Sequence, residues 1–92
     1  MAEKKIGIIE DYFAKIGVAV VNLTDGDVKV GDKVHITGHT TDLIQEVKSM
    51  QIEHKGVNEA GKGDIIGLKV DDRVRKHDTV FLITEDWKAI KK

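Results

Sequence analysis

The sequence has no cysteine and no proline, and its aromatic residues are one Trp, one Tyr and two Phe among 92 residues. Without cysteine, neither a disulfide framework nor a zinc site with thiolate ligands is available, and nothing points to an oxidising compartment. Without proline, exposed edge strands lack one of the residues that prevent them from pairing with other chains, and they must rely on lysine instead. These absences exclude the disulfide-rich secreted class and leave an ordinary globular protein.

An excess of charge of one sign is also missing. The 15 basic and 16 acidic side chains leave a formal net charge of −1. Such a balance argues against the phosphate-driven affinity on which strong nonspecific nucleic-acid binding depends. The first residues lead into alternating β-forming residues, without the unbroken apolar run of a signal peptide or membrane span. We therefore expect a soluble, cytoplasmic protein without membrane contact.

The residues that are present favour strands. Hydrophobic residues make up 40% of the chain, and most of them are valine and isoleucine. β-Branched side chains are stiff and fit the pleated surface of a sheet better than a helix. A chain of this length builds one core. We therefore predict one all-β domain over residues 1–92, with its strands between residues 5 and 84 and a short polar tail over residues 85–92.

The segment from residue 25 to residue 38 carries the clearest pattern. Two turns, Asp25-Gly26 and Gly31-Asp32, precede a run in which Val34 and Ile36 alternate with polar residues. Alternation with period two places the apolar residues on one face of a strand. The segment is typical of a corner of a small β-barrel.

Two segments on either side of this corner leave more than one interpretation. Residues 5–23 read as two strands, and Gly7 and Gly17 within them indicate either a closely approaching backbone or a sharp bend.

In residues 43–54, Leu43 and Val47 fit a helical spacing, whereas a bulge near Lys48 restores the spacing of a strand. We predict strands there, and a loop over residues 55–63, which contain three glycines.

Several motifs together resemble the second, β-barrel domain of translational GTPases such as elongation factor Tu. The chain resembles most closely the free-standing translation elongation factor-like proteins, and also the C-terminal barrel of collagenase-like peptidases that modify RNA. The resemblance covers about residues 5 to 84. It is carried by residues 16–21 (IGVAVV), 30–38 (VGDKVHITG), 47–52 (VKSMQI), 60–70 (AGKGDIIGLKV) and 74–80 (VRKHDTV).

The resemblance implies a closed, six-stranded antiparallel β-barrel of the translation-factor second-domain type. It does not imply GTP hydrolysis, because the chain lacks the phosphate-cradling loop that ends in Lys-Ser or Lys-Thr. In elongation factor Tu, the aminoacyl end of tRNA docks near a Gly-Glu-Asn-Val-Gly strand. Here Gly63-Asp64-Ile65-Ile66-Gly67 stands in its place, so the asparagine amide is missing. His77 occupies a position where related barrels often carry glycine, which implies a tighter turn or a left-handed histidine.

The candidate binding residues are mostly basic. Both arginines of the chain, Arg73 and Arg75, lie within three residues of each other and are followed by Lys76. Arginine suits bidentate contacts with phosphate or carboxylate groups, although a solvated turn is the simpler interpretation. With the neighbouring barrel loops included, the predicted RNA-binding or partner-binding residues are Lys62, Asp64, Lys69, Arg73, Arg75 and Lys76.

Catalytic and metal sites are not expected. His35 and His39 share a strand face but lie about 13 Å apart, too far to bind one ion, so we expect solvent-facing histidines and no metal or other cofactor. Ser49 is the only serine, and no base within immediate reach would activate it. Trp87, in the tail, is either a lid over the barrel end or an anchor for a partner.

These observations lead to two hypotheses. The first is a non-catalytic, translation elongation factor-like binding module that contacts RNA, the ribosome or an RNA-modifying enzyme through the loops at one barrel end. The alternative is a protein–protein interaction adaptor, the detached accessory barrel of a peptidase-like partner, which acts through a sheet edge or through the Trp87 tail.

Overall fold

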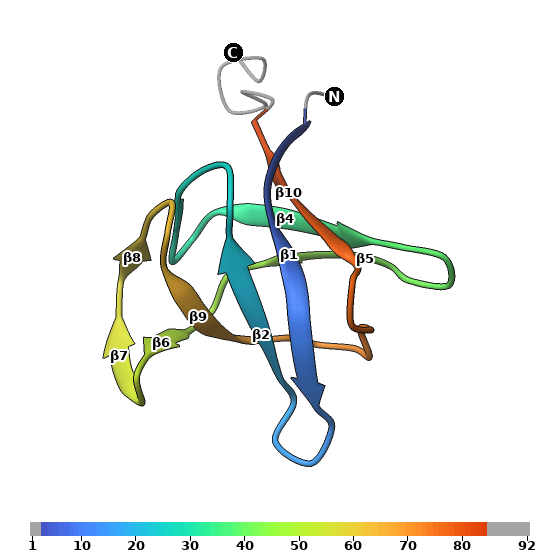
Figure 1. Ribbon diagram of the computed structural model, residues 1–92, viewed down its shortest axis with the longest axis horizontal. Coiled ribbons are helices and arrows are strands. Elements are labelled where there is room, and N and C mark those ends of the chain that lie inside the picture. The colour runs from blue at the N-terminus through green and yellow to red at the C-terminus, as the bar shows by residue number, and fades with distance from the viewer. Residues whose placement is uncertain (1–2, 85–92) are drawn as a thin grey trace.

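The protein is described by a computed structural model over residues 3–84, and Trp87 with the rest of the predicted tail lies outside the described residues. This part consists of β-strands joined by turns, as Figure 1 shows, and no helix occurs within it. The strands are β1 (Glu3–Phe13), β2 (Val18–Leu23), β3 (Val28–Lys29), β4 (Lys33–Thr37), β5 (Asp42–Glu46), β6 (Met50–Ile52), β7 (Lys55–Val57), β8 (Glu59–Ala60), β9 (Ile65–Lys69) and β10 (Thr79–Ile83).

The predicted all-β class is confirmed, and so is the absence of a helix in residues 43–54. That segment forms β5 and β6, separated by three irregular residues, Val47 to Ser49. The predicted loop over residues 55–63 was wrong in part, because it contains the short strands β7 and β8. No helix that could span a membrane occurs in residues 3–84.

The sheet differs from the predicted closed six-stranded barrel. Eight strands form one sheet in the order β5-β4-β10-β1-β2-β9-β6-β7, and β3 and β8 form a separate antiparallel pair. Within residues 3–84, the end strands β5 and β7 do not pair with each other, so the backbone ladder stays open. A short strand at residues 28–30 was expected and is present as β3, whereas β7 and β8 were missed because they contain only three and two residues and give almost no periodic signal.

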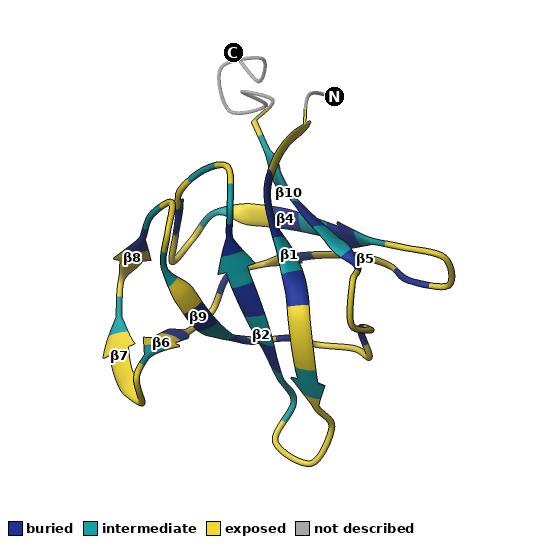
Figure 2. Ribbon diagram, viewed as in Figure 1, coloured by how far each residue is buried: buried dark blue, intermediate teal, exposed yellow. Residues whose placement is uncertain are grey.

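The sheet nevertheless curls around a single hydrophobic core. In β2 and β4 every second residue is buried, and Figure 2 shows buried and more exposed residues alternating along these strands. The inward faces of the strands supply one cluster of buried hydrophobic residues, and burial of such side chains is the main stabilising term in folding. Its fully buried large members are Ile6, Ile9, Val21, Leu23, Val34, Ile36, Val47, Met50, Ile66, Leu68, Val74 and Val80.

Gly7 and Gly17 illustrate the two reasons for glycine that the sequence suggested. At Gly7 the register between β1 and β10 shifts, and a Cβ there would overlap the backbone carbonyl oxygen of Asn22 in β2. Gly17 lies in the turn after β1 with φ +65°. Glycine therefore permits a close backbone approach at the first position and a sharp bend at the second.

A buried glutamine crosses the gap in the backbone ladder. Gln45, in β5, is only 6% exposed. Its Nε2 donates a hydrogen bond to the Lys69 carbonyl at 3.0 Å, and its Oε1 accepts one from the Asp71 amide at 2.7 Å. β5 and β9 are not neighbours in the sheet order. A side chain therefore links the end strand β5 to the end of β9, a strand with which β5 does not pair.

Candidate functional site

The six predicted binding residues do not form one basic rim. Lys62 and Asp64 lie in the turn between β8 and β9, next to an acidic groove. Lys69 ends β9, and its Nζ donates a hydrogen bond to the Ile16 carbonyl at 2.8 Å. The remaining three residues lie in the segment between β9 and β10. The structure thus divides the predicted site among three surroundings, and only the last keeps several cations together.

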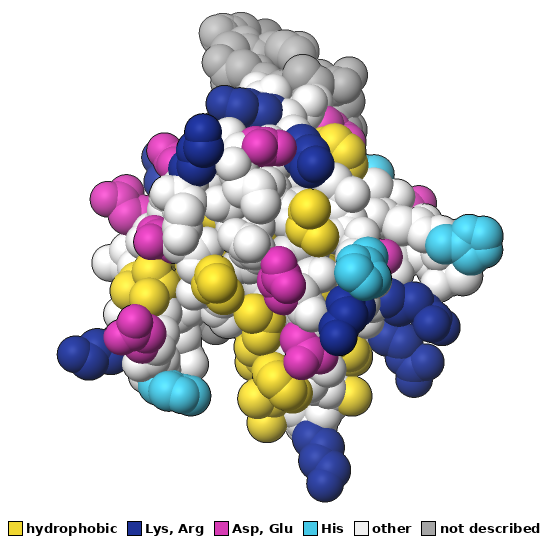
Figure 3. Space-filling view, in the orientation of Figure 1, with side chains coloured by type: hydrophobic (Ala, Val, Ile, Leu, Met, Phe, Trp, Pro, Cys, Tyr) yellow, Lys and Arg dark blue, Asp and Glu magenta, His cyan; other side chains and the backbone are white. Residues whose placement is uncertain are grey.

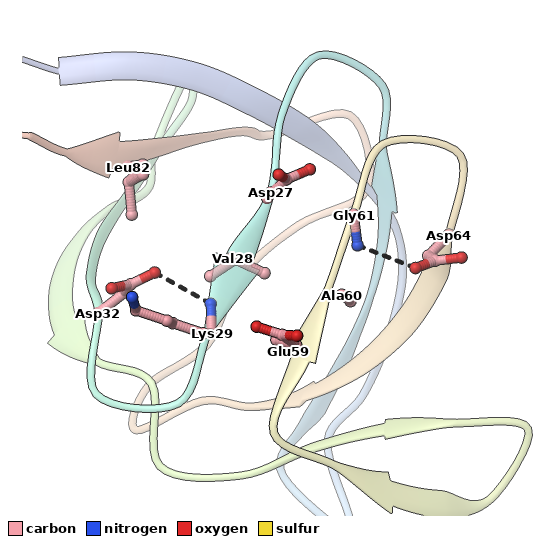
Figure 4. Close-up of a pocket in the computed structure, with 9 residues that line it drawn as sticks. All are labelled: Asp27, Val28, Lys29, Asp32, Glu59, Ala60, Gly61, Asp64 and Leu82. Carbon is pink, nitrogen blue, oxygen red and sulfur yellow. Dashed lines mark hydrogen bonds between the residues drawn. The ribbon is translucent and has the colours of Figure 1, made fainter.

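The acidic groove lies beside the β3–β8 pair and has a volume of about 580 Å³. Figure 4 shows that carboxylates from three turns and from β8 surround it, with Lys29 as its one cationic lining residue. The residues that line it are Asp27, Val28, Lys29, Asp32, Glu59, Ala60, Gly61, Asp64 and Leu82.

Two of these carboxylates hold the backbone of their own turns, and a third holds the backbone of the facing turn. Asp32 accepts a hydrogen bond from the Lys29 amide at 2.9 Å, and Asp64 accepts one from the Gly61 amide at 2.9 Å. Asp27 accepts one from the Lys62 amide at 3.1 Å, which joins the two sides of the groove. Aspartate is common in turns because its side chain satisfies amides of this kind. Turn structure therefore accounts for three of the four carboxylates of the acidic groove, and the fourth is Glu59 of β8.

A second groove, of about 380 Å³, lies between the β4–β5 hairpin and the segment that connects β9 to β10. We call it the arginine groove. Of the predicted site residues it contains Arg73 and Arg75, and Lys76 follows them in the same exposed segment. Figure 3 shows Lys and Arg side chains gathered on this part of the molecule. The groove is lined by Thr40, Thr41, Asp42, Leu43, Asp72, Arg73 and Arg75.

The segment that carries the arginines is held firmly on both sides. Val74 is 2% exposed, so the residues on either side of it, Arg73 and Arg75, both face solvent. Asp78 is 4% exposed, and its carboxylate accepts a hydrogen bond from the Arg75 amide at 2.8 Å. His77 has φ +77°, which confirms the left-handed histidine and gives the turn before β10 its tight bend.

Residues 3–84 contain no arrangement typical of an active site. No group of three or more His, Asp or Glu side chains that could hold a metal ion occurs in this part of the chain. Ser49 is exposed between β5 and β6, and its hydroxyl has no hydrogen bond within the described residues. General-base activation of a hydroxyl nucleophile requires a base within hydrogen-bond reach.

His35 is the side chain whose surroundings the sequence did not predict. It is half-buried rather than solvent-facing, and it lies between two carboxylates from different strands. Its Nδ1 is 2.7 Å from a Glu3 oxygen, and its Nε2 is 2.6 Å from an Asp42 oxygen. A carboxylate oxygen only accepts hydrogen bonds, so both ring nitrogens donate when His35 is the imidazolium cation. The three residues join β1, β4 and β5.

This bridge raises the pKa of His35 above its usual value of 6.5, chiefly through the hydrogen bond to Asp42; burial opposes that rise, and Glu3 adds to it. Because the pKa is higher in the folded protein, protonation stabilises the fold fully below about 6.5. That stabilisation disappears as the pH rises through the raised pKa. Since the Asp42 side chain is 80% exposed, we expect protonation of His35 to stabilise the fold by only about 0.5 to 1 kcal/mol.

The measurement is urea unfolding of the wild type and of His35→Gln at about pH 5.5 and about pH 9. The difference in unfolding free energy between the two proteins should be larger at the lower pH. His39→Gln, which replaces an exposed histidine of the same hairpin, controls for loss of a histidine as such. Equal differences at both pH values would show that the bridge does not depend on the imidazolium.

Large apolar side chains are exposed at the tip of the β1–β2 hairpin. Phe13 and Ile16 are 48% and 60% exposed, and yellow side chains gather at this end of the molecule in Figure 3. The backbone of the tip is well bonded, because the Gly17 amide donates to the Phe13 carbonyl and Lys69 caps the Ile16 carbonyl. The hairpin therefore holds these two side chains in solvent on an ordered backbone.

Comparison with known proteins gives two sequence relatives of interest, and no protein-family model matches the chain. The chain is 43% identical over 82 residues to the uncharacterized protease MJ0090 of Methanocaldococcus jannaschii. It is 37% identical over 71 residues to a collagenase of Porphyromonas gingivalis. These matches cover 88% and 76% of this chain, but only 20% of each relative. The chain thus spans about a fifth of the length of the relatives it matches.

The fold is also that of a solved domain. The C-terminal domain of a protein named as a U32 peptidase, from Geobacillus thermoleovorans, superimposes with a TM-score of 0.81 over 88% of this chain and 93% of that chain. A selenomethionine variant of the same domain gives a TM-score of 0.78 over 84% of this chain and 96% of that chain. The sequence identities are 18% and 19%, so this likeness establishes the fold.

The comparisons correct the predicted family. The relatives are named protease and collagenase, and the solved domain comes from a protein named as a U32 peptidase, not from translation elongation factors. The translation-factor function, with its predicted RNA or ribosome contact, was therefore wrong, whereas the likeness to the C-terminal barrel of collagenase-like peptidases agrees with these findings. The quoted motifs misled because they consist of barrel turns and strands, which different families share.

Proposed function

We propose that this chain is a protein-interaction module that works with a larger, peptidase-like protein as its accessory part. The observation that carries this proposal is the asymmetry of the sequence matches. The match to MJ0090 covers 88% of this chain but 20% of that protein. Almost the whole chain therefore corresponds to one minor segment of a much longer protein that is named as a protease.

The accessory role is proposed as non-catalytic. The grooves of residues 3–84 are lined by turn-capping carboxylates and by arginines, and their geometry suits recognition better than bond cleavage. Exposed apolar side chains on an ordered hairpin, such as Phe13 and Ile16, are also typical of protein contacts. The cysteine-free composition supports the cytoplasm as the proposed compartment.

The test is affinity capture with the complete chain in a nuclease-treated lysate of its source organism. We expect one stoichiometric partner, identified by mass spectrometry, that resembles the remaining, larger part of MJ0090. The purified chain alone should leave gelatin and casein uncut, in the same assay that detects cleavage by the captured complex.

Two results would contradict the proposal. One is cleavage of either substrate by the chain alone, lost when a surface residue of the chain is replaced. The other is a capture experiment in which the native chain retains no more protein from the lysate than a heat-denatured sample of the same chain retains.

A further inference from the structure

We propose that the arginine groove binds an acidic peptide segment of the partner, with carboxylate side chains of that segment on Arg73 and Arg75. This inference rests on the proposed protein-interaction function and adds the place and the chemistry of the contact. It depends on the pairing of the charges around the groove, on the rigidity of the arginine segment and on the mixture of donors and acceptors in the lining.

The two guanidinium groups are not paired within residues 3–84. Among the described residues, neither Arg73 nor Arg75 has a side-chain hydrogen bond or ion pair, although two aspartates line the same groove. Both aspartates have other partners: Asp42 contacts His35 at 2.6 Å, and Asp72 accepts a hydrogen bond from the Arg73 amide at 2.7 Å. The groove therefore offers two planar cations, each suited to bidentate contact with an incoming carboxylate.

A third aspartate next to the groove is also engaged. Lys48 contacts both oxygens of Asp71, at 3.1 and 3.2 Å. Lys76, in contrast, is exposed directly after the arginines and adds a further positive charge on the same segment. Arg73, Arg75 and Lys76 thus place three positive charges on one segment, beside the two carboxylates that line the groove, in a protein whose net charge is −1. Complementary charge steers a partner to such a place and fixes its orientation.

The arginines are presented by an ordered backbone. The Ile9 amide donates to the Asp78 carbonyl and the His77 amide donates to the Ile9 carbonyl, both at 2.8 Å, so the end of the segment is fixed to β1. A Cβ at Gly38 would overlap the Asp78 carboxylate, which shows how closely the β4–β5 hairpin packs against it. Binding to a surface that is already ordered loses less conformational entropy.

The lining favours a peptide over a nucleic acid. Besides the arginines, the groove presents the carboxylates of Asp42 and Asp72 and the hydroxyls of Thr40 and Thr41. Carboxylates accept hydrogen bonds, so a fitting ligand needs donors as well as anionic groups. A peptide with acidic side chains has both, because its backbone carries N–H groups. A phosphodiester group has only acceptors, so it offers no hydrogen-bond donor to the two aspartates.

The test measures binding of a defined peptide to the complete chain by NMR titration at about 50 mM salt. The probe is a twelve-residue peptide of alternating Glu and Ser with blocked ends, and a matched Gln-Ser peptide is its neutral control. We expect shifts confined to the amides around residues 40–43 and 72–76. The double variant Arg73→Ala, Arg75→Ala should bind at least about tenfold more weakly, which corresponds to about 1.4 kcal/mol.

A second double variant, matched in charge, tests whether peptide binding depends on the arginine groove or only on the net charge of the protein. The double variant Lys4→Ala, Lys55→Ala removes two exposed cations from elsewhere on the surface and should bind the acidic peptide like the wild type. Arg73→Lys, Arg75→Lys keeps the charge but loses the bidentate geometry, so its affinity should be intermediate.

Three outcomes would overturn the inference. They are equal binding by the arginine and lysine double-alanine variants, equal binding of the Glu-Ser and Gln-Ser peptides, and tighter binding of a dodecamer RNA than of the acidic peptide. The arginine variant should also lose the partner in the lysate capture. If it keeps a partner that the wild type retains, the inference fails while the proposed function stands. If the wild type retains no partner, the proposed function fails whatever the peptide does.

Discussion

Replacement of Gly7 by alanine is expected to lower the free energy of unfolding by about 2 to 3 kcal/mol. The new methyl group would overlap the carbonyl oxygen of Asn22 and would lie 3.2 Å from the Cα of Leu23. Both contacts are with backbone atoms of β2, which is paired on its other side with β9. The clash therefore cannot be relieved by rotation of a side chain, and two strands at the middle of the sheet must move apart.

The measurement is urea unfolding followed by circular dichroism, with thermal unfolding beside it. For a domain of this size, each kcal/mol corresponds to about 4 to 8 °C in the midpoint. The matched control is Gly56→Ala in β7, where an added Cβ has nothing within 4 Å and φ is not in the left-handed region. That control should unfold like the wild type. Equal losses in the two variants would mean that the close approach at Gly7 does not constrain the sheet.

Replacement of Gln45 by leucine is expected to cost about 3 kcal/mol, because it breaks the link between β5 and the end of β9. The volume of the side chain is nearly kept, but the Lys69 carbonyl and the Asp71 amide lose their partner. A buried polar group without a partner costs about 1 to 3 kcal/mol. Both hydrogen bonds are partly buried, so the two losses together are expected to come to about 3 kcal/mol.

Local opening should accompany this loss of stability. In the Leu variant, the Asp71 amide should exchange with solvent much faster than in the wild type, because its acceptor is gone. Gln51→Leu makes the same chemical change at an exposed position in β6 and should leave both stability and exchange unaltered. If the Asp71 amide stays protected and the unfolding free energy is unchanged, then the sheet is held together without Gln45.

The link at Gln45 also bears on the arginine groove. Gln45 holds the start of the segment after β9, and Asp78 holds its end through the Arg75 amide. The arginines lie between these two anchors. The polar side chains that complete the curled sheet are thus the same ones that fix the proposed binding segment, so the Gln45→Leu variant should be excluded from binding experiments.

Local patterns in the sequence determined the class of structure and several of its details. Alternation in residues 33–37 and the β-branched composition predicted strands, because side-chain direction in a strand follows from the backbone alone. The left-handed conformation of His77 was expected from the family resemblance, and the need for glycine at position 7 comes from the approaching backbone of β2. In residues 43–54 the pattern alone slightly favoured a helix, and strands were predicted correctly only because a helix would have left the expected barrel one strand short.

The tertiary structure alone decided how distant residues meet. Gln45 bonds to the carbonyl of a residue 24 positions away, and His35 contacts Glu3 across 32 positions. The same holds for the groove, in which Thr40 and Thr41 from one hairpin face Arg73 and Arg75 from another segment. No periodic pattern encodes such pairs, because they depend on how far the sheet curls and on which strand ends it brings together. The sequence therefore indicated which residues were arginines, and only the fold showed that they share a groove.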